Sequence, residues 1–320
     1  FGSSCFYVSS QSALMNGAEQ RKPSLAKLLK YGANPNAFSL EDMGQRRTLL
    51  CLAIEEAEKI VNFDKIDLLL EAKADPNLKS ETGDWPLMLA TKHEDIELAR
   101  KLLHLKADPN LQDEKQVSAL HVATHQNDAH MVQLLLMHGA LVNSVDRMGQ
   151  TPLFFGQSRD ILHSLLEADA DVLHLNKKSQ CALHLTSSSG YFDAVTYLVD
   201  RTQMGDMVNL RDEHGRTPLH HAAFRGHVDI MSRLMDVGAD PKVKTKKGQT
   251  AMTLADEQGH TDAAYYVYNR VSGGNSVSWR EALHNPVFLT VAAVMGVTSL
   301  MNRKVLWELS LDMLGLLFKR

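Results

Sequence analysis

The stretch that decides the fold is GRTPLHHAAFRGHVDIMSRLMDVGADPKVK, residues 215–244. Thr217 is a residue type that caps helix N-termini, and Pro218 suits the first helical position because its missing N–H would have no partner there. Small apolar residues keep one face of this first helix narrow, and a second apolar stripe over residues 228–234 predicts another helix. Each predicted helix is followed by a glycine able to take the left-handed conformation that ends helices, Gly226 and Gly238. The stretch therefore predicts two short helices and an extended, turn-rich arm.

The same pattern recurs along the chain. Related starts of the Ser/Thr-x-Leu kind stand at residues 12, 48, 85, 118, 151, 181, 217 and 250, so successive starts lie 30 to 37 residues apart. A period near 33 residues is typical of a stacked array. One such unit cannot bury its apolar face alone, and its neighbours must cover it.

These residues resemble the ankyrin repeat family. The TPLHxA start of that family is complete in TPLHHA, residues 217–222, and nearly complete in SALHVA, residues 118–123. The resemblance covers residues 9–270. It implies an all-α fold, an ankyrin-repeat solenoid of eight stacked helix-turn-helix units with short hairpin-like arms.

The domain organisation follows from where the repeat pattern holds. Residues 1–8 are an N-terminal fragment, residues 9–270 are the ankyrin repeat array, and residues 271–279 are a linker of Gly and Ser composition. Residues 280–320 are predicted to be a C-terminal apolar helical tail. Because the chain opens on Phe1 rather than Met, we expect a processed chain or part of a larger protein.

Several repeats depart from the common pattern. Lys73, Lys106 and Asp169 occupy the slot of the left-handed glycine, which should cost each lysine about 1 kcal/mol relative to glycine. The second repeat has extra residues around 55–65, and the fifth is short by three, which predicts a truncated first helix. The sixth carries an insertion at residues 200–209 that predicts a widened loop. Drift in a tolerant scaffold accounts for these departures more readily than a partner site does.

The tail contains an apolar run, PVFLTVAAVMGVTSLM, residues 286–301, without a charged residue. At ~1.5 Å per residue it spans about 24 Å as a helix, against a bilayer hydrocarbon core of about 30 Å. The length favours a helical cap on the array or an apolar hairpin. The alternative is membrane contact through residues 286–318, with Arg303, Lys304, Lys319 and Arg320 as interfacial anchors.

Composition and motifs argue against several classes of function. The formal net charge of −4 gives no indication of nucleic-acid binding. The three cysteines lie far apart, as in a protein of a reducing compartment, so we expect a cytoplasmic location, with membrane association under the alternative above. No phosphate-binding loop, HExxH, GxSxG or GxGxxG motif is present, so we expect no enzyme activity, no cofactor and no metal.

Three histidines and one cysteine recur at fixed places in their repeats. His121, His184 and His220 share one position, and the resemblance implies that this histidine satisfies backbone groups near the turn rather than binding a metal. Cys181 stands in the slot of a capping threonine, which predicts a buried or half-buried thiol rather than a nucleophile.

Ankyrin proteins usually bind partners on the concave side, formed by the arm tips and the exposed face of the first helices. In this chain the early tips are acidic or neutral and the later tips are basic. Phe224 is expected to be exposed beside Arg225, and aromatic and arginine side chains are common interface anchors. Carried over, the partner-binding residues are Lys115, Arg147, Lys177, Lys178, His214, Arg216, Phe224, Arg225, Lys246 and Lys247. The alternative is that these charges form only a solvated rim.

The sequence therefore predicts a monomeric, non-catalytic scaffold or adaptor that binds an acidic partner protein in the concave groove. The alternative is a membrane-tethered adaptor, or a fragment of a larger membrane protein, acting through residues 286–318. A third interpretation is an enzyme whose catalytic domain lies outside this chain.

Overall fold

The structure is a computed structural model that describes residues 24–40, 46–60, 64–80, 83–202 and 205–272. Its internal contacts divide the chain into two compact units, residues 1–174 (unit 1) and residues 175–320 (unit 2). The expectations for residues 1–8, for the start of the first repeat and for the tail at 280–320 fall outside the described residues.

Unit 1 begins, in its described part, with a helix and an antiparallel strand pair. Helix α2 (Leu25–Lys30) precedes β1 (Phe38–Leu40), which pairs with β2 (Arg46–Thr48) so that Phe38 lies opposite Thr48. Within the described ranges this is the one sheet in an otherwise helical chain. It forms the arm ahead of the second repeat, in keeping with the expected hairpin-like arms.

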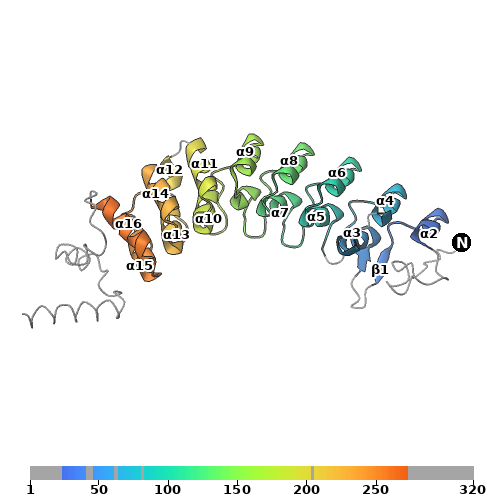
Figure 1. The fold of residues 1–320 in the computed structure, drawn as a ribbon, viewed down its shortest axis with the longest axis horizontal. Helices are drawn as coiled ribbons and strands as arrows, with labels where there is room; N and C mark the ends of the chain where they lie inside the picture. The colour runs from blue at the N-terminus through green and yellow to red at the C-terminus, as the bar shows by residue number, and fades with distance from the viewer. Residues whose placement is uncertain (1–23, 41–45, 61–63, 81–82, 203–204, 273–320) are drawn as a thin grey trace, which may run out of the picture. The chain divides into compact units, whose positions relative to one another are not determined.

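The rest of unit 1 consists of consecutive helix pairs. In Figure 1 the first helices lie along one side of the unit and the second helices along the other, with the arms projecting beyond the first helices. The pairs are α3 (Leu49–Ile60) with α4 (Asp64–Glu71), α5 (Pro86–Lys92) with α6 (Ile96–His104), α7 (Ala119–His125) with α8 (Ala129–Met137), and the 3₁₀ helix η1 (Pro152–Phe155) with α9 (Arg159–Glu167).

Unit 2 repeats the arrangement. Its helices are α10 (Ala182–Ser189), α11 (Phe192–Thr202), α12 (Gly205–Val208), α13 (Pro218–Arg225), α14 (Val228–Asp236), α15 (Ala251–Glu257) and α16 (Thr261–Val271). Helix α13 packs against both α10 and α15, and α14 packs against α13. The predicted start and end of the decisive stretch are confirmed, because Thr217 is the N-cap of α13 and Gly226 its left-handed C-cap at φ 76°.

The core lies between the paired helices and between successive pairs. In α13 and α14 the residues facing this core are fully buried, namely Leu219, Ala222, Ala223, Ile230, Met231 and Leu234. Complete burial of a leucine or isoleucine side chain contributes about 1.5–3 kcal/mol relative to exposure. The alanines let the neighbouring helices approach closely, so each repeat depends on its neighbours for burial.

The predicted departures from the repeat have mixed outcomes. Lys73, Lys106 and Asp169 adopt the left-handed conformation at φ 63°, 69° and 62°, as expected for their slot. The fifth repeat has a truncated first helix, since η1 contains only four residues.

The predicted loop at residues 200–209 is wrong for residues 200–202 and 205–208, which are helical. Helix α11 continues to Thr202, and α12 follows within the insertion. Its Met207 and Val208 are 1% and 3% exposed, so apolar burial gives this segment a helical conformation. At the other end of unit 2, α16 extends to Val271, which was assigned to the linker.

A row of asparagines joins several of the repeats to the next. The Oδ1 atom of Asn77 accepts the N–H of Asp108 at 2.8 Å, and its Nδ2 donates to the carbonyl of Lys106 at 2.9 Å. The same two bonds recur at Asn110 and Asn143 in unit 1 and at Asn209 in unit 2. In the fifth repeat the corresponding residue is Leu173, which has no side-chain amide.

Within the described ranges, no helix is both long enough and apolar enough to cross a membrane. The apolar run at residues 286–301 lies outside those ranges.

Candidate partner-binding surface

Four of the arm tips are tight turns, each held by one acidic or amide side chain. In the tip before α13, the Oδ1 atom of Asp212 accepts the N–H groups of His214 and Arg216 at 2.9 and 2.8 Å. Asp113, Asp146 and Asn176 bind their own tips in the same way. These turns are therefore preorganised, and the side chains they carry start from fixed backbone positions.

Backbone hydrogen bonds join neighbouring tips. In unit 2 the N–H of Glu213 donates to the carbonyl of Lys178 at 3.0 Å, and the N–H of Lys246 donates to the carbonyl of His214 at 2.9 Å. Six of the predicted site residues, Lys177, Lys178, His214, Arg216, Lys246 and Lys247, thus belong to three consecutive tips. In unit 1 the N–H of Arg147 donates to the carbonyl of Lys115 at 2.9 Å, which makes the other two predicted tip residues neighbours.

Phe224 lies at the end of α13 with two guanidinium groups over its ring. The Cζ atoms of Arg216 and Arg225 are 5.4 and 5.9 Å from the ring centroid. The expectation that Phe224 is exposed is wrong, because the ring is half-buried, while Arg225 is exposed. Cation–π attraction orients both arginines on one aromatic support.

The backbone of Arg216 is held from two sides. Its carbonyl accepts the N–H of Asp212 at 2.8 Å and lies 3.3 Å from the Nε2 of His184. The backbone of Arg216 is therefore held in place by these contacts, while its guanidinium lies over the ring of Phe224.

A carboxylate–imidazole pair lies next to this aromatic cluster. The Nε2 of His221, on α13, is 3.0 Å from the Oδ2 of Asp212, whose side chain is 1% exposed. Burial by itself raises the pKa of Asp212, but hydrogen bonds from His221 and from the N–H groups of Arg216 and His214 outweigh it and hold the pKa below its usual range. The carboxylate of Asp212 thus makes its contacts with the backbone of the tip and with His221. Sequence reasoning missed this pair, because its partners are nine residues apart and on different elements.

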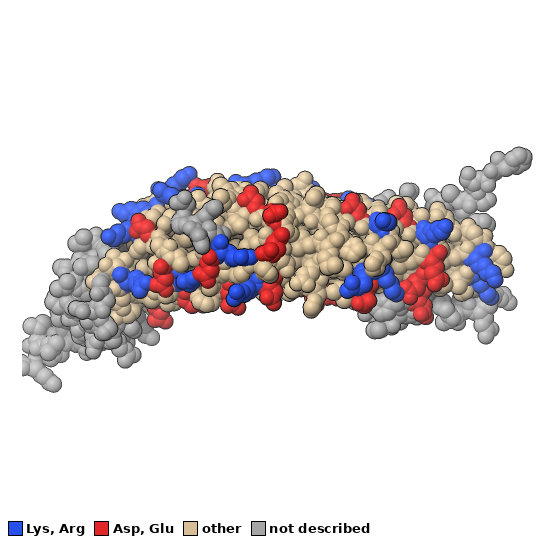
Figure 2. Space-filling model, turned by 90° about the horizontal axis from the view of Figure 1, so that it is seen from above, with Lys and Arg blue, Asp and Glu red and all other residues tan. Residues whose placement is uncertain are grey.

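The basic residues of the unit 2 tips and of α13 are without carboxylate partners among the described residues, namely Lys177, Lys178, Arg216, Arg225, Lys246 and Lys247. The second helices differ, because their cations pair across successive repeats. Lys101 lies 2.9 Å from Asp67 in unit 1, and Arg233 pairs with Asp200 in unit 2. The second helices of unit 1 lie along the top of Figure 1, and Figure 2 shows acidic and basic side chains interspersed on that face.

The three recurrent histidines have the scaffold role that was predicted. In His220 the Nδ1 atom accepts the N–H of Thr217 at 3.2 Å and lies 2.8 Å from its hydroxyl oxygen, and Nε2 lies 3.1 Å from the carbonyl of Val243. His121 and His184 make equivalent contacts. Burial lowers the pKa of His184 and of His220 to about 4, and it also lowers the pKa of His121. All three rings therefore stay neutral near pH 7.

Cys181 is fully buried, which confirms the predicted thiol environment. Its Sγ lies 3.2 Å from the Nδ1 of His184, in the position of a capping hydroxyl. Burial raises the pKa of this thiol, so it stays protonated and poorly nucleophilic.

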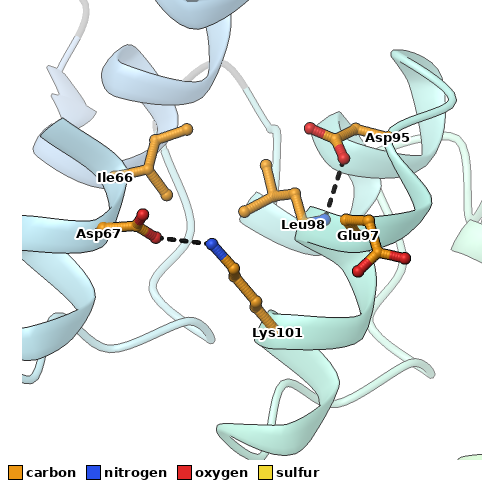
Figure 3. A pocket seen from close by; sticks show the side chains of 6 residues that line it. All are labelled: Ile66, Asp67, Asp95, Glu97, Leu98 and Lys101. Carbon is orange, nitrogen blue, oxygen red and sulfur yellow. Dashed lines mark hydrogen bonds and ion pairs between the residues drawn. The ribbon is translucent and has the colours of Figure 1, made fainter. Parts of the chain in front are cut away.

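A hollow of about 260 Å³ lies between α4 and α6 in unit 1 (Figure 3). Ile66 and Leu98 form its apolar part, and the charged side chains that line it make contacts within the protein. Asp95 caps α6 by accepting the N–H of Leu98 at 2.9 Å, Lys101 pairs with Asp67, and Glu97 lies 3.8 Å from Arg100. The hollow lies where two repeats pack against each other, and the residues that line it include no nucleophile with an adjacent base.

Curated proteins share parts of this chain. BCL-6 corepressor-like protein 1 of Homo sapiens is 29% identical over 141 residues, 43% of this chain and 8% of that protein. Protein phosphatase 1 regulatory subunit 12A of Mus musculus is 39% identical over 88 residues, 28% of this chain and 8% of that protein. A Caenorhabditis elegans homolog of transient receptor potential cation channel subfamily A member 1 is 30% identical over 122 residues, 37% of this chain and 10% of that protein. The chain therefore spans about a tenth of the length of these relatives.

The family model for ankyrin repeats matches the chain in three copies, at residues 14–113, 87–173 and 154–245. These matches overlap and run without a gap from residue 14 to residue 245, well over half of the chain. They agree with the paired helices, the left-handed helix ends and the buried capping histidines, and this chain belongs to the ankyrin repeat family.

Proposed function

We propose that this chain is a non-catalytic scaffold that binds an acidic partner protein through the tips and first helices of unit 2. Ankyrin repeats are a protein-interaction module in general. One relative, protein phosphatase 1 regulatory subunit 12A, is by its name a regulatory subunit.

The observation that carries the proposal is the set of uncompensated cations on this surface. Four lysines, two in the tip before α10 and two in the tip before α15, and the two arginines on Phe224 have no carboxylate partner among the described residues. A surface of one sign accelerates the encounter with a partner of the opposite sign. The half-buried ring of Phe224, with its arginines held in place, is suited to be the central anchor.

The test begins with affinity capture by the full chain and identification of the bound protein. With that protein in hand, Lys246→Glu should slow association and weaken the dependence of the association rate on salt, because rim charges act on the encounter. Lys242→Glu is the matched control, since this exposed lysine belongs to the same arm but lies outside the tip. Equal association rates for the two variants would exclude the tips as the binding surface.

The anchor is tested by dissociation. Phe224→Ala should speed dissociation by about 5-fold to 150-fold, equivalent to about 1–3 kcal/mol, because the ring would be lost and both arginines would lose their support. Since the ring is half-buried, circular dichroism and the unfolding midpoint should be recorded for the same variant. An unchanged dissociation rate in a folded variant would contradict the anchor role.

A further inference from the structure

The face of unit 2 that carries Phe224 is not uniformly basic. Helix α15 packs directly against α13, and its last two residues are Asp256 and Glu257. Glu257 lies one repeat of 33 residues after Phe224, so the two residues occupy equivalent places in adjacent repeats. The two guanidinium groups over the ring of Phe224 are thus followed, in the next repeat, by a carboxylate pair at the end of α15.

The two charge pairs are not neutralised inside the molecule. Among the described residues, neither arginine has a carboxylate partner and neither carboxylate has a cation partner. Glu257 accepts a hydrogen bond from the side-chain amide of Gln249, which carries no charge. Burial, with a further contribution from the charge of Glu257, raises the pKa of Asp256. A carboxyl next to a cation would show the opposite shift.

The arginines start from fixed positions, and the helix that carries the carboxylates is capped at its start. The ring of Phe224 supports the arginines, and the tip turn around Asp212 fixes the backbone of Arg216. At the start of α15, the Oγ1 of Thr253 accepts the N–H of Thr250 at 2.8 Å, and the Oγ1 of Thr250 accepts the N–H of Thr253 at 3.3 Å. Preorganised charges lose little conformational freedom on binding, so they can discriminate between partners.

We propose that α13 and α15 recognise a partner segment in which an acidic block lies beside a basic block. The acidic block binds Arg216 and Arg225, and the basic block binds Asp256 and Glu257. This inference rests on the proposed function, because it specifies the charge pattern of the partner at that same surface. A uniformly acidic segment would place like charges against Asp256 and Glu257, and such juxtapositions suppress wrong partners.

The experiment uses a display library of random 15-residue peptides, selected on the immobilised full chain. The wild-type chain should enrich peptides that combine acidic and basic residues. Asp256→Asn with Glu257→Gln should abolish the enrichment of basic residues and leave that of acidic residues. Arg216→Gln with Arg225→Gln should do the reverse. Asp229→Asn with Asp262→Asn, two acidic positions in the first turns of α14 and α16, is the matched control and should leave the wild-type pattern unchanged.

The outcomes separate this inference from the proposed function. Enrichment of acidic residues alone, unaffected by the changes at Asp256 and Glu257, would overturn the paired-charge inference and leave the basic surface as a binding site. Peptides with no charge bias, selected equally well by the double arginine variant, would overturn both. Circular dichroism of each variant shows that a lost enrichment does not result from unfolding.

Discussion

The histidines at the helix caps show how one side chain connects local and tertiary structure. The Nδ1 atom of His184 accepts the N–H of Cys181 at 3.2 Å, while Nε2 lies 3.1 Å from the carbonyl of Leu210. A proton on Nδ1 would point at the N–H of Cys181, which is itself a donor and offers no lone pair. Burial and the electrostatic effect of His221 lower the pKa of His184 to about 4, against the opposing effects of Asp212 and of the carbonyls of Arg216 and Leu210, so the neutral ring is favoured.

The lowered pKa values of His184 and His220 predict a loss of stability in acid. In the unfolded chain an imidazole binds a proton below about pH 6.5, whereas in the folded chain these two do so only near pH 4. Their contribution is therefore present above pH 6.5 and is lost as pH falls from 6.5 to 4. It amounts to roughly 3 kcal/mol for each residue, at about 1.4 kcal/mol per pKa unit.

Urea unfolding midpoints between pH 4 and 8 measure this effect. His184→Asn should lower the free energy of unfolding at pH 7 and reduce its slope between pH 6.5 and 4. Between pH 7 and 8 the wild-type and variant curves should run parallel, because the imidazole is then neutral in both states. Parallel curves over the whole range would contradict the assignment.

At the scale of the element, the asparagine row predicts how strongly successive repeats are joined. Asn77→Ala removes two hydrogen bonds to the next turn, at 2.8 and 2.9 Å. Since each intramolecular hydrogen bond contributes about 1 kcal/mol, we expect a loss of about 1–2 kcal/mol in the free energy of unfolding. Gln133→Ala, at an exposed position of α8, is the control and should change stability by less than about 0.5 kcal/mol. Equal losses in the two variants would show that the asparagine does not join the repeats.

The fifth repeat is the element expected to open first. Helix η1 has four residues, whereas α7 has seven and α13 has eight, so it provides fewer helical hydrogen bonds and less buried surface. Amide hydrogen exchange followed by mass spectrometry should show faster exchange for peptides covering residues 152–156 than for those covering α7 or α13. Equal protection of the three segments would mean that tertiary packing compensates for the missing turn.

At the scale of the whole molecule, the apolar run at residues 286–301 distinguishes a scaffold from a membrane-tethered adaptor. A helix of about 24 Å is shorter than a hydrocarbon core of about 30 Å, so we expect the full chain to stay unbound when phosphatidylcholine vesicles are floated on a density gradient. Val294→Lys is the paired variant. If the wild-type chain floats with the vesicles and the Val294→Lys variant does not, the result would instead support the membrane-tethered alternative.

The sequence by itself determined the repeating helix pairs of this protein and the conformations at their ends. Thr217 and Pro218 start α13, Gly226 ends it, and Lys73 takes the left-handed conformation of its slot. These outcomes depend on interactions within about four residues, which a local pattern records. The tip lysines could also be assigned from the sequence, because a residue's place in one repeat gives its place in the next.

Only the tertiary structure decided the features that depend on neighbouring repeats. These features are the stacking of Arg216 on Phe224, the pairing of His221 with Asp212, the packing of α15 against α13 and the folding of residues 205–208 into a helix. The contact of Arg216 with Phe224 joins residues 8 apart, that of His221 with Asp212 residues 9 apart, and the bond from His220 to Val243 residues 23 apart. The physical reason is that one repeat's exposed positions become contacts only when the register of the adjoining repeat brings a partner within reach.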